Sequence, residues 1–167
     1  MKKFKPLSIH VIRDHVLLGG LAAACLAPKL GIAGSLMFWA ATVLFDLDHY
    51  LRFLLLGKFK KTGIQSMFAF FERSFESRNH PDFLALDVFH TAEFLIFFGL
   101  FVFYAAPFLL AVLWGFLFHM VVDFFHLLRH RALTKRAHSF VEYYIRKRII
   151  ERRGGNPEAL NAKIYAG

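Results

Sequence analysis

Four long apolar stretches, separated by short polar or basic segments, dominate the pattern of the sequence. Each has about 20 residues or slightly more, the length that an α-helix needs to cross the hydrocarbon core of a bilayer. Pro28 and Gly31 mark the end of the first stretch, and Pro107 suits the first turn of the last one. The predicted helices cover residues 8–27, 32–56, 83–106 and 107–128.

The remaining segments are polar but keep some helical character. Residues 58–82 form a middle loop whose Met67–Phe71 run and following charges predict a short amphipathic helix at the membrane interface. Residues 134–153 predict a basic helix in the tail. We therefore expect an all-α fold in two parts: a transmembrane four-helix domain over residues 1–133, which includes the amphipathic cytoplasmic loop at 58–82, and a basic cytoplasmic tail over 134–167.

Composition supports a membrane protein. Hydrophobic residues make up 57% of the 167 residues, above the 45–50% of soluble domains, and the mean hydropathy is +0.45. The two turns 28–31 and 104–107 contain only one basic residue, Lys29, whereas Lys2, Lys3 and Lys5, the middle loop and the tail are basic. The positive-inside rule then predicts a multi-pass protein of the cell (inner) membrane with both termini in the cytoplasm.

The net charge of +9 lies on the same side as these basic segments, where it would meet anionic lipids. No motif that reads bases accompanies it, so we expect no nucleic-acid partner. The single Cys25 fits no metal motif.

Acidic residues at membrane depth are the unusual feature of the predicted helices. Six of the twelve acids lie in or at the ends of these helices, against only two bases, Arg13 and Arg52. Charges at this depth are costly and are normally paired or functional. The excess of acids therefore indicates either protonated carboxyls or a bound cation. The six acids are Asp14, Asp46, Asp48, Asp87, Glu93 and Asp123.

Depth and facing bring several of these groups together. At a rise of 1.5 Å per residue, each predicted helix places a His or carboxylate roughly 18–24 Å from its extracytoplasmic end. His119 and Asp123 share one helix face, because they are four residues apart. Asp48 falls nearly opposite Asp46 on an ideal helix, so only a distorted helix end would turn both inward. The groups in this layer are His15, Asp46, His90, Glu93, His119 and Asp123.

Mixed imidazole and carboxylate ligands suit Zn better than Ca or Mg, with Mn or Fe as further options. The number of candidate ligands is compatible with one or two divalent ions per chain. Other interpretations remain open: an Asp46–Arg52 ion pair, a divalent-cation or proton transporter, a haem-binding bundle using His90 and His119, or a membrane protein without catalysis.

Four sequence elements, in order, resemble those of small membrane-bound, metal-dependent hydrolases related to the LexA-regulated inner-membrane proteins. They read Asp14-His15-Val-Leu-Leu-Gly19, Phe45-Asp-Leu-Asp-His49, His90-Thr-Ala-Glu93 and His119-Met-Val-Val-Asp123. Members of this family often have a longer His-Arg-Gly-x-Thr-His-Ser run as the third element, and here it is His90-Thr-Ala-Glu93.

The resemblance implies a metal-dependent hydrolase. The position of the layer near the cytoplasmic face, under a basic surface, suggests an anionic, lipid-derived substrate such as a phosphoester. The expected metal ligands are His15, Asp46, Asp48, His49, His90, Glu93, His119 and Asp123. Glu93 is the candidate general base, with Asp48 as a second candidate catalytic group. Arg52, Arg78 and Arg129 are the residues expected to hold a phosphate.

Overall fold

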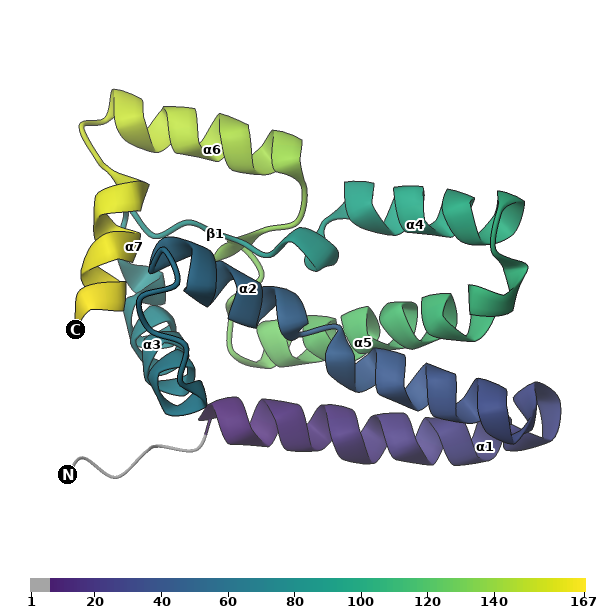
Figure 1. Ribbon diagram of the computed structural model, residues 1–167. Helices are drawn as coiled ribbons and strands as arrows, with labels where there is room; N and C mark the ends of the chain where they lie inside the picture. Colours follow the sequence, from purple (N-terminus) through teal and green to yellow (C-terminus); the bar gives the residue numbers. More distant parts are fainter. Residues whose placement is uncertain (1–6) are drawn as a thin grey trace.

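Helices form nearly all of the regular structure in residues 7–167, the part of the chain that the computed structural model describes, with side chains placed from Val11 onward (Figure 1). The all-α prediction is confirmed at this level. Lys2, Lys3 and Lys5, used above to predict orientation, lie outside the described residues. The helices are α1 (Leu7–Leu44), α2 (Leu47–Leu56), α3 (Ile64–Glu76), α4 (Ala92–Tyr104), α5 (Leu110–Arg129), α6 (Phe140–Arg152) and α7 (Pro157–Ala166). Three 3₁₀ turns, η1 (Ser77–Asn79), η2 (Val88–His90) and η3 (Pro107–Leu109), and two short strands, β1 (Ala85–Leu86) and β2 (Arg136–Ala137), complete the fold.

The first helix is a hairpin of two arms that reverses at Gly31. Gly31 has φ 67° and ψ 174°, a left-handed region of backbone space that favours glycine. Pro28 was predicted to end the first helix, but it lies inside the first arm, where its ring removes one hydrogen bond shortly before the reversal. The indole Nε1 of Trp39 donates to the carbonyl of Val16 at 3.0 Å and joins the two arms.

The second predicted helix, residues 32–56, is interrupted. The backbone leaves the helix at a turn over Phe45 and Asp46 and resumes as α2. This break is the kind of distorted helix end that would be needed for Asp46 and Asp48 both to point inward.

The third predicted helix, residues 83–106, is wrong in its first half. Residues 85–86 form β1, which pairs in parallel with β2, and η2 then leads into α4. The cause is a tertiary contact, since β1 finds its partner some 50 residues later in the chain. The helix proper begins after Thr91, whose side chain accepts a hydrogen bond from the amide of Phe94.

Helices α1 and α5 pack closely along most of their length (Figure 1). Gly115 allows this approach, because a Cβ built there would lie 2.4 Å from the carbonyl oxygen of Phe38. The hydroxyl of Thr42 donates across the same interface to the carbonyl of Gly115 at 3.3 Å. These contacts at Gly115 fix the position of α5 along the second arm of α1.

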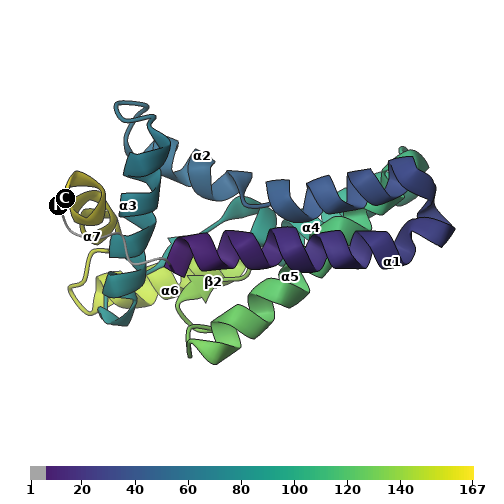
Figure 2. The same cartoon turned by 90° about the horizontal axis from the view of Figure 1, so that it is seen from below.

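The other end of the molecule is built by α2, α3 and α7. Phe53, Phe70 and Ile164, one from each helix, form a buried cluster there. The end of the tail thus packs against the helical domain. Helix α3 lies across the open end of the α1 hairpin (Figure 2).

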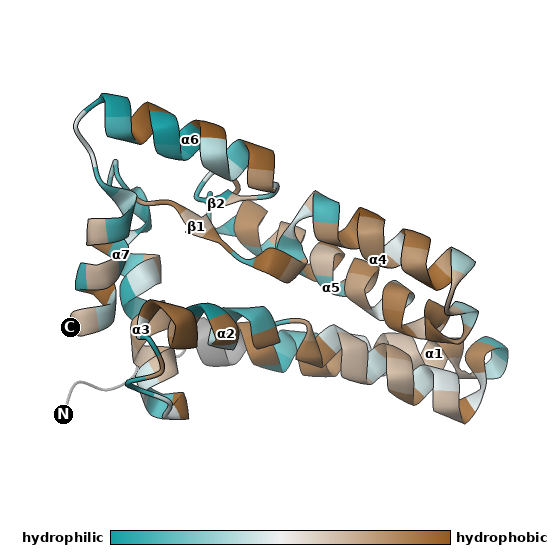
Figure 3. Cartoon of the chain, turned by 45° about the horizontal axis from the view of Figure 1, so that its top comes forward, coloured by the Kyte–Doolittle hydropathy of each residue, from teal (hydrophilic) through white to brown (hydrophobic). Residues whose placement is uncertain are grey.

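Two helical stretches, Val11–Leu56 and Pro107–Arg129, are long and apolar enough to cross a membrane, and the first of them contains the hairpin. Helix α4 is apolar but has only 13 residues, fewer than the roughly 20 that a crossing needs. The four full-length crossings are therefore not reproduced. Large apolar side chains are exposed on α1, α4 and α5. Helix α6 alternates between hydrophilic and hydrophobic residues (Figure 3).

Candidate metal centre

The Nε2 atoms of three buried histidines, His15, His90 and His119, point into one space. The Nδ1 of His15 lies 2.9 Å from the carbonyl oxygen of Val11, and that of His119 lies 2.7 Å from the carbonyl oxygen of Thr42. The Nδ1 of His90 lies 3.0 Å from Oδ2 of Asp48. Because these oxygens can only accept, each Nδ1 carries the proton and each Nε2 keeps a free lone pair.

In this neutral tautomer the lone pairs of the three Nε2 atoms face each other. The Nε2 atoms of His90 and His119 are 3.1 Å apart. The Nε2 of His15 is buried and has no hydrogen-bond partner. Lone pairs held this close repel each other unless a cation lies among them, and a metal ion is what neutral imidazoles of this arrangement bind.

Two carboxylates complete the group. Asp46 Oδ1 is 3.4 Å from Nε2 of His119 and 3.6 Å from Nε2 of His90. The oxygens of Asp123 lie 3.4, 3.8 and 3.5 Å from the Nε2 atoms of His90, His119 and His15. Ligands bound at about 2.1 Å to a tetrahedral ion are roughly 3.4 Å from one another. The observed separations of 3.1 to 3.8 Å match this spacing, so the residues fit a divalent ion.

Four separate parts of the fold supply the five candidate ligands. His15 lies in the first arm of α1, Asp46 in the turn after the second arm, His90 at the end of η2, and His119 with Asp123 on one face of α5. The rings of His15 and His119 stack with their centroids 4.0 Å apart. The fully buried ring of Phe45 packs against His90 and His119. The three histidines are at most 1% exposed.

His49 extends the group toward the surface. Its Nε2 is 3.2 Å from Oδ1 of Asp46, and its Nδ1 is 3.0 Å from Oδ1 of Asp87. Asp46, His49 and His90 could hold an ion together, as could His15, Asp46 and His119, or His90, His119 and Asp123. Asp46 and the histidines at 90 and 119 each belong to two of these sets, so the cluster has donors for one ion or for two that share ligands.

Asp48 lies behind His90 and does not face the other ligands. Its Oδ2 accepts from the amide of Phe89 at 2.8 Å and from the ring of His90. This carboxylate–histidine pair fixes the ring orientation and raises the basicity of the inward nitrogen, as partners of metal-bound histidines commonly do. The structure thus places Asp48 as a support of a ligand.

Glu93 is directed elsewhere. Its Oε1 accepts a 3.0 Å hydrogen bond from the amide of Phe140, at the first turn of α6. It belongs to none of the three ligand sets among the described residues. The predicted third helix, on which Glu93 would share a face with His90, does not exist at His90, and this separates the two.

The pKa values of two groups outside the candidate spans follow from their surroundings. Burial lowers the pKa of His90, which keeps its imidazole neutral and able to coordinate. Burial alone would raise the pKa of Asp87, but the charges of His49 and Arg52 hold it well below its ordinary value. Asp87 therefore stays ionised between the imidazole of His49 and the guanidinium of Arg52.

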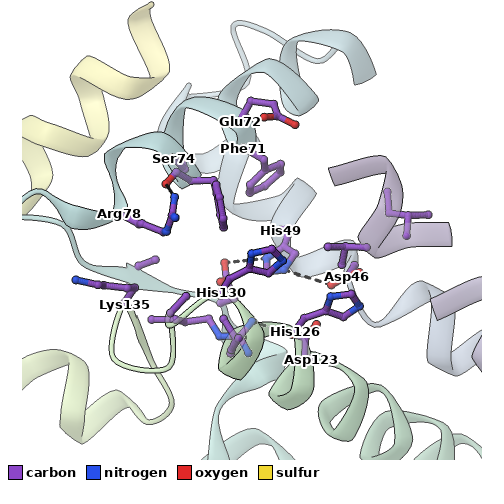
Figure 4. Close-up of a pocket in the computed structure, with 18 of the residues that line it drawn as sticks. Asp46, His49, Phe71, Glu72, Ser74, Arg78, Asp123, His126, His130 and Lys135 are labelled. Atoms are coloured by element: carbon purple, nitrogen blue, oxygen red, sulfur yellow. Dashed lines mark hydrogen bonds and ion pairs between the residues drawn. The ribbon is translucent and has the colours of Figure 1, made fainter. Parts of the chain in front are cut away.

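A cavity of about 300 Å³ reaches this group from one side (Figure 4). Asp46, His49 and Asp123 line it where it meets the cluster, and α3 contributes Phe71 and Phe75 from the facing wall. The middle loop, predicted as an interfacial segment, thus covers the approach to the cluster.

The basic residues around the cavity differ from those predicted. Arg78 lines the cavity, and its Nη1 donates to the carbonyl of Phe75 at 2.7 Å. Arg52 instead pairs with Asp87 at 3.4 Å, and Arg129 is exposed and not among the lining residues. Arg136 was not predicted, yet it lines the cavity and its Nη1 lies 3.1 Å from Oδ2 of Asp123. No sequence signal singles it out, because β2 approaches the cluster only through its pairing with β1.

Comparisons with known proteins identify no relative: no family model, no curated protein and no solved structure matches the chain.

Proposed function

We propose that this chain is an integral-membrane, metal-dependent hydrolase that binds one or two divalent ions, with Zn²⁺ favoured and Mn²⁺ or Fe²⁺ as alternatives. The observation that carries the proposal is the convergence of the buried Nε2 atoms of three histidines with two carboxylates, at separations of 3.1–3.8 Å. The four motifs of the hydrolases related to the LexA-regulated inner-membrane proteins supply the residues of this site, and we propose membership of that family on this ground.

A divalent ion would supply an acidified water and would polarise the scissile group. The residues of the chain would bind the ion and orient its ligands. His15, His90, His119, Asp46 and Asp123 hold the ion, and the buried carbonyls and Asp48 keep the three rings in the required tautomer.

His49 has a carboxylate at each ring nitrogen, Asp46 at 3.2 Å and Asp87 at 3.0 Å, and this favours its protonated form. It also lines the cavity, so we assign it the role of general acid that donates a proton to the leaving group. Glu93, the base predicted from sequence, does not line the cavity, and its Oε1 is bonded to the α6 backbone.

The membrane placement that we propose keeps the α1 hairpin, α4 and α5 in the bilayer and both termini in the cytoplasm of the inner membrane. Exposed apolar side chains on these helices support it, because a soluble protein rarely exposes so many. Examples, with their exposed fractions, are Leu21 (65%), Ile32 (81%), Phe97 (70%), Phe103 (68%) and Phe108 (74%). The basic helix α6 and the cavity would then face the cytoplasm and anionic lipids.

The substrate that we propose is a phosphoester or another lipid-derived anion, since basic side chains line a cavity that also has an apolar wall. The His and Asp cluster borders the cavity through Asp46 and Asp123, so a phosphate bound in the cavity would lie next to it. Phosphoryl groups are recognised through bidentate guanidinium contacts and point charges of this kind.

Elemental analysis of the detergent-purified protein tests the metal site. We expect one or two equivalents of Zn, Mn or Fe in the wild type, and loss of the metal in His119→Ala and Asp123→Ala. His80→Ala is the matched control, because His80 is exposed and lies outside the three ligand sets. A wild type that stays metal-free after reconstitution with Zn²⁺, Mn²⁺ and Fe²⁺ in turn would refute the proposal.

A further inference from the structure

Arg136 has an unusual environment for an arginine. It is only 8% exposed, and its Nε is buried without a hydrogen-bond partner, although one terminal nitrogen pairs with Asp123. Leaving a buried charged donor unpaired is costly unless a ligand satisfies it. Arg136 also lines the cavity next to Asp123, so a ligand inside the cavity would meet its guanidinium beside the candidate metal centre.

The charge of the cavity wall depends on the metal. Four carboxylates and three lysine or arginine side chains line the cavity, and the charge of His49 offsets the remaining carboxylate. One divalent ion at the cluster would make the wall net positive. An anion is therefore attracted to Arg136 more strongly when the centre is loaded. The lining acids are Asp46, Glu72, Asp87 and Asp123, and the bases are Arg78, Lys135 and Arg136.

The wall opposite the cluster is apolar. Helix α3 contributes Met67, Phe68, Phe71 and Phe75, and the first arm of α1 contributes Ile12. Ile12 is 38% exposed and belongs to α1, the helix that we place in lipid, so the apolar side of the cavity adjoins a helix of the membrane domain. A ligand with a hydrocarbon chain can therefore enter from the bilayer and leave its charged end at Arg136.

We infer that the cavity binds a lipid phosphate monoester, with its phosphate on Arg136 and Lys135 beside the metal centre and its chain against the apolar face of α3. This inference rests on the proposed function, since the charge argument requires a bound metal. It replaces Arg52 and Arg129 by Arg136 as the phosphate-binding residue. In this arrangement Arg136 is a positioning residue for the ester bond, because it holds the phosphorus next to Asp46 and Asp123.

Binding measurements with three small probes test the inference. Zn²⁺-loaded protein in phosphatidylcholine nanodiscs is titrated calorimetrically with methyl phosphate, octyl phosphate and 1-octanol, and empty nanodiscs give the background. We expect octyl phosphate to bind at least about tenfold more tightly than methyl phosphate, because burial of each methylene is favourable. We also expect removal of the metal to weaken binding of both phosphates.

The variants separate the two ends of the ligand. Arg136→Gln and Lys135→Gln should weaken both phosphates, the first by about tenfold or more, and leave 1-octanol unchanged. Phe68→Gln should remove the preference for octyl over methyl phosphate. Arg153→Gln, an exposed residue outside the cavity, should behave as the wild type.

Metal content is measured for every variant, so the two proposals fail in different ways. If the wild type binds no metal, both fall. If it binds metal but octyl phosphate shows no advantage, or if Lys135→Gln and Arg136→Gln with full metal content keep wild-type affinity, only the present inference is overturned. If Arg136→Gln loses its metal, Lys135→Gln and Phe68→Gln decide the outcome.

Discussion

Gly115→Ala should damage the metal centre from a distance. An added Cβ would lie 2.4 Å from the carbonyl oxygen of Phe38 and 2.7 Å from Cβ of Ala41, whereas ordinary contacts begin near 3.4 Å. Helices α1 and α5 must therefore separate by about 1 Å. The carbonyl of Thr42 that orients His119 lies on α1, one residue beyond Ala41, so the separation pulls this acceptor away from the ring.

The expected size follows from the same geometry. Overpacking of this kind costs about 1–3 kcal/mol of stability. Metal ligands tolerate only about 0.2 Å of displacement, and loss of a partner that orients a ligand typically reduces metal affinity about 10- to 100-fold. We expect a lower midpoint of thermal unfolding in detergent, and weaker Zn²⁺ binding in competition with a chromogenic chelator.

Gly99→Ala is the matched control. Gly99 also lies inside a helix, but a Cβ there meets nothing within 4 Å. The substitution should leave Zn²⁺ affinity unchanged and add up to about 1 kcal/mol of stability through helix propensity. If Gly115→Ala keeps wild-type stability and Zn²⁺ affinity, the coupling between helix packing and the metal centre is refuted.

Three further predictions concern the support of the site and its placement. Asp48→Asn should lower Zn²⁺ affinity about 10- to 100-fold without abolishing binding, as measured by the same chelator competition; complete loss would make Asp48 a direct ligand. Glu93→Gln should keep full metal content by elemental analysis, because its carboxylate caps α6, and a metal-free variant would return Glu93 to the ligand set. In a Cys25→Ala background, a cysteine at Lys29 should react with an impermeant maleimide from outside intact cells and one at Arg153 only after lysis; the reverse pattern would invert the proposed topology.

Prediction from sequence was most accurate where two polar residues four positions apart fell within a real helix. His119 and Asp123, four residues apart, were predicted to share a face, and α5 presents both to the other ligands. Depth along the predicted helices also grouped His15 with Asp46 correctly, because the α1 hairpin reverses close to the predicted turn.

The prediction was weaker where tertiary contacts determine the backbone. Residues 83–91 are as apolar as a helix requires, but pairing of β1 with β2 and the turn at η2 hold His90 in a non-helical segment. His90 still reaches the cluster, whereas Glu93, assigned to the same face, is directed to α6. Arg136 was missed for the same reason, since only the strand pairing brings the tail to Asp123.

The α1 hairpin has a consequence for how the protein is assembled. His15 and Asp46 are almost equally far along the chain from Gly31, so they meet at the open end of the hairpin, opposite the turn. An ion bound there would link the two arms through His15 and Asp46, and α5 would supply His119 as a further ligand. Because binding of a metal by the folded site adds directly to folding free energy, supply of the ion would set how much of the newly inserted chain matures. In cells starved of the metal, no ion would link the two arms. The incompletely folded chain would then be exposed to membrane proteases before it could act on any substrate.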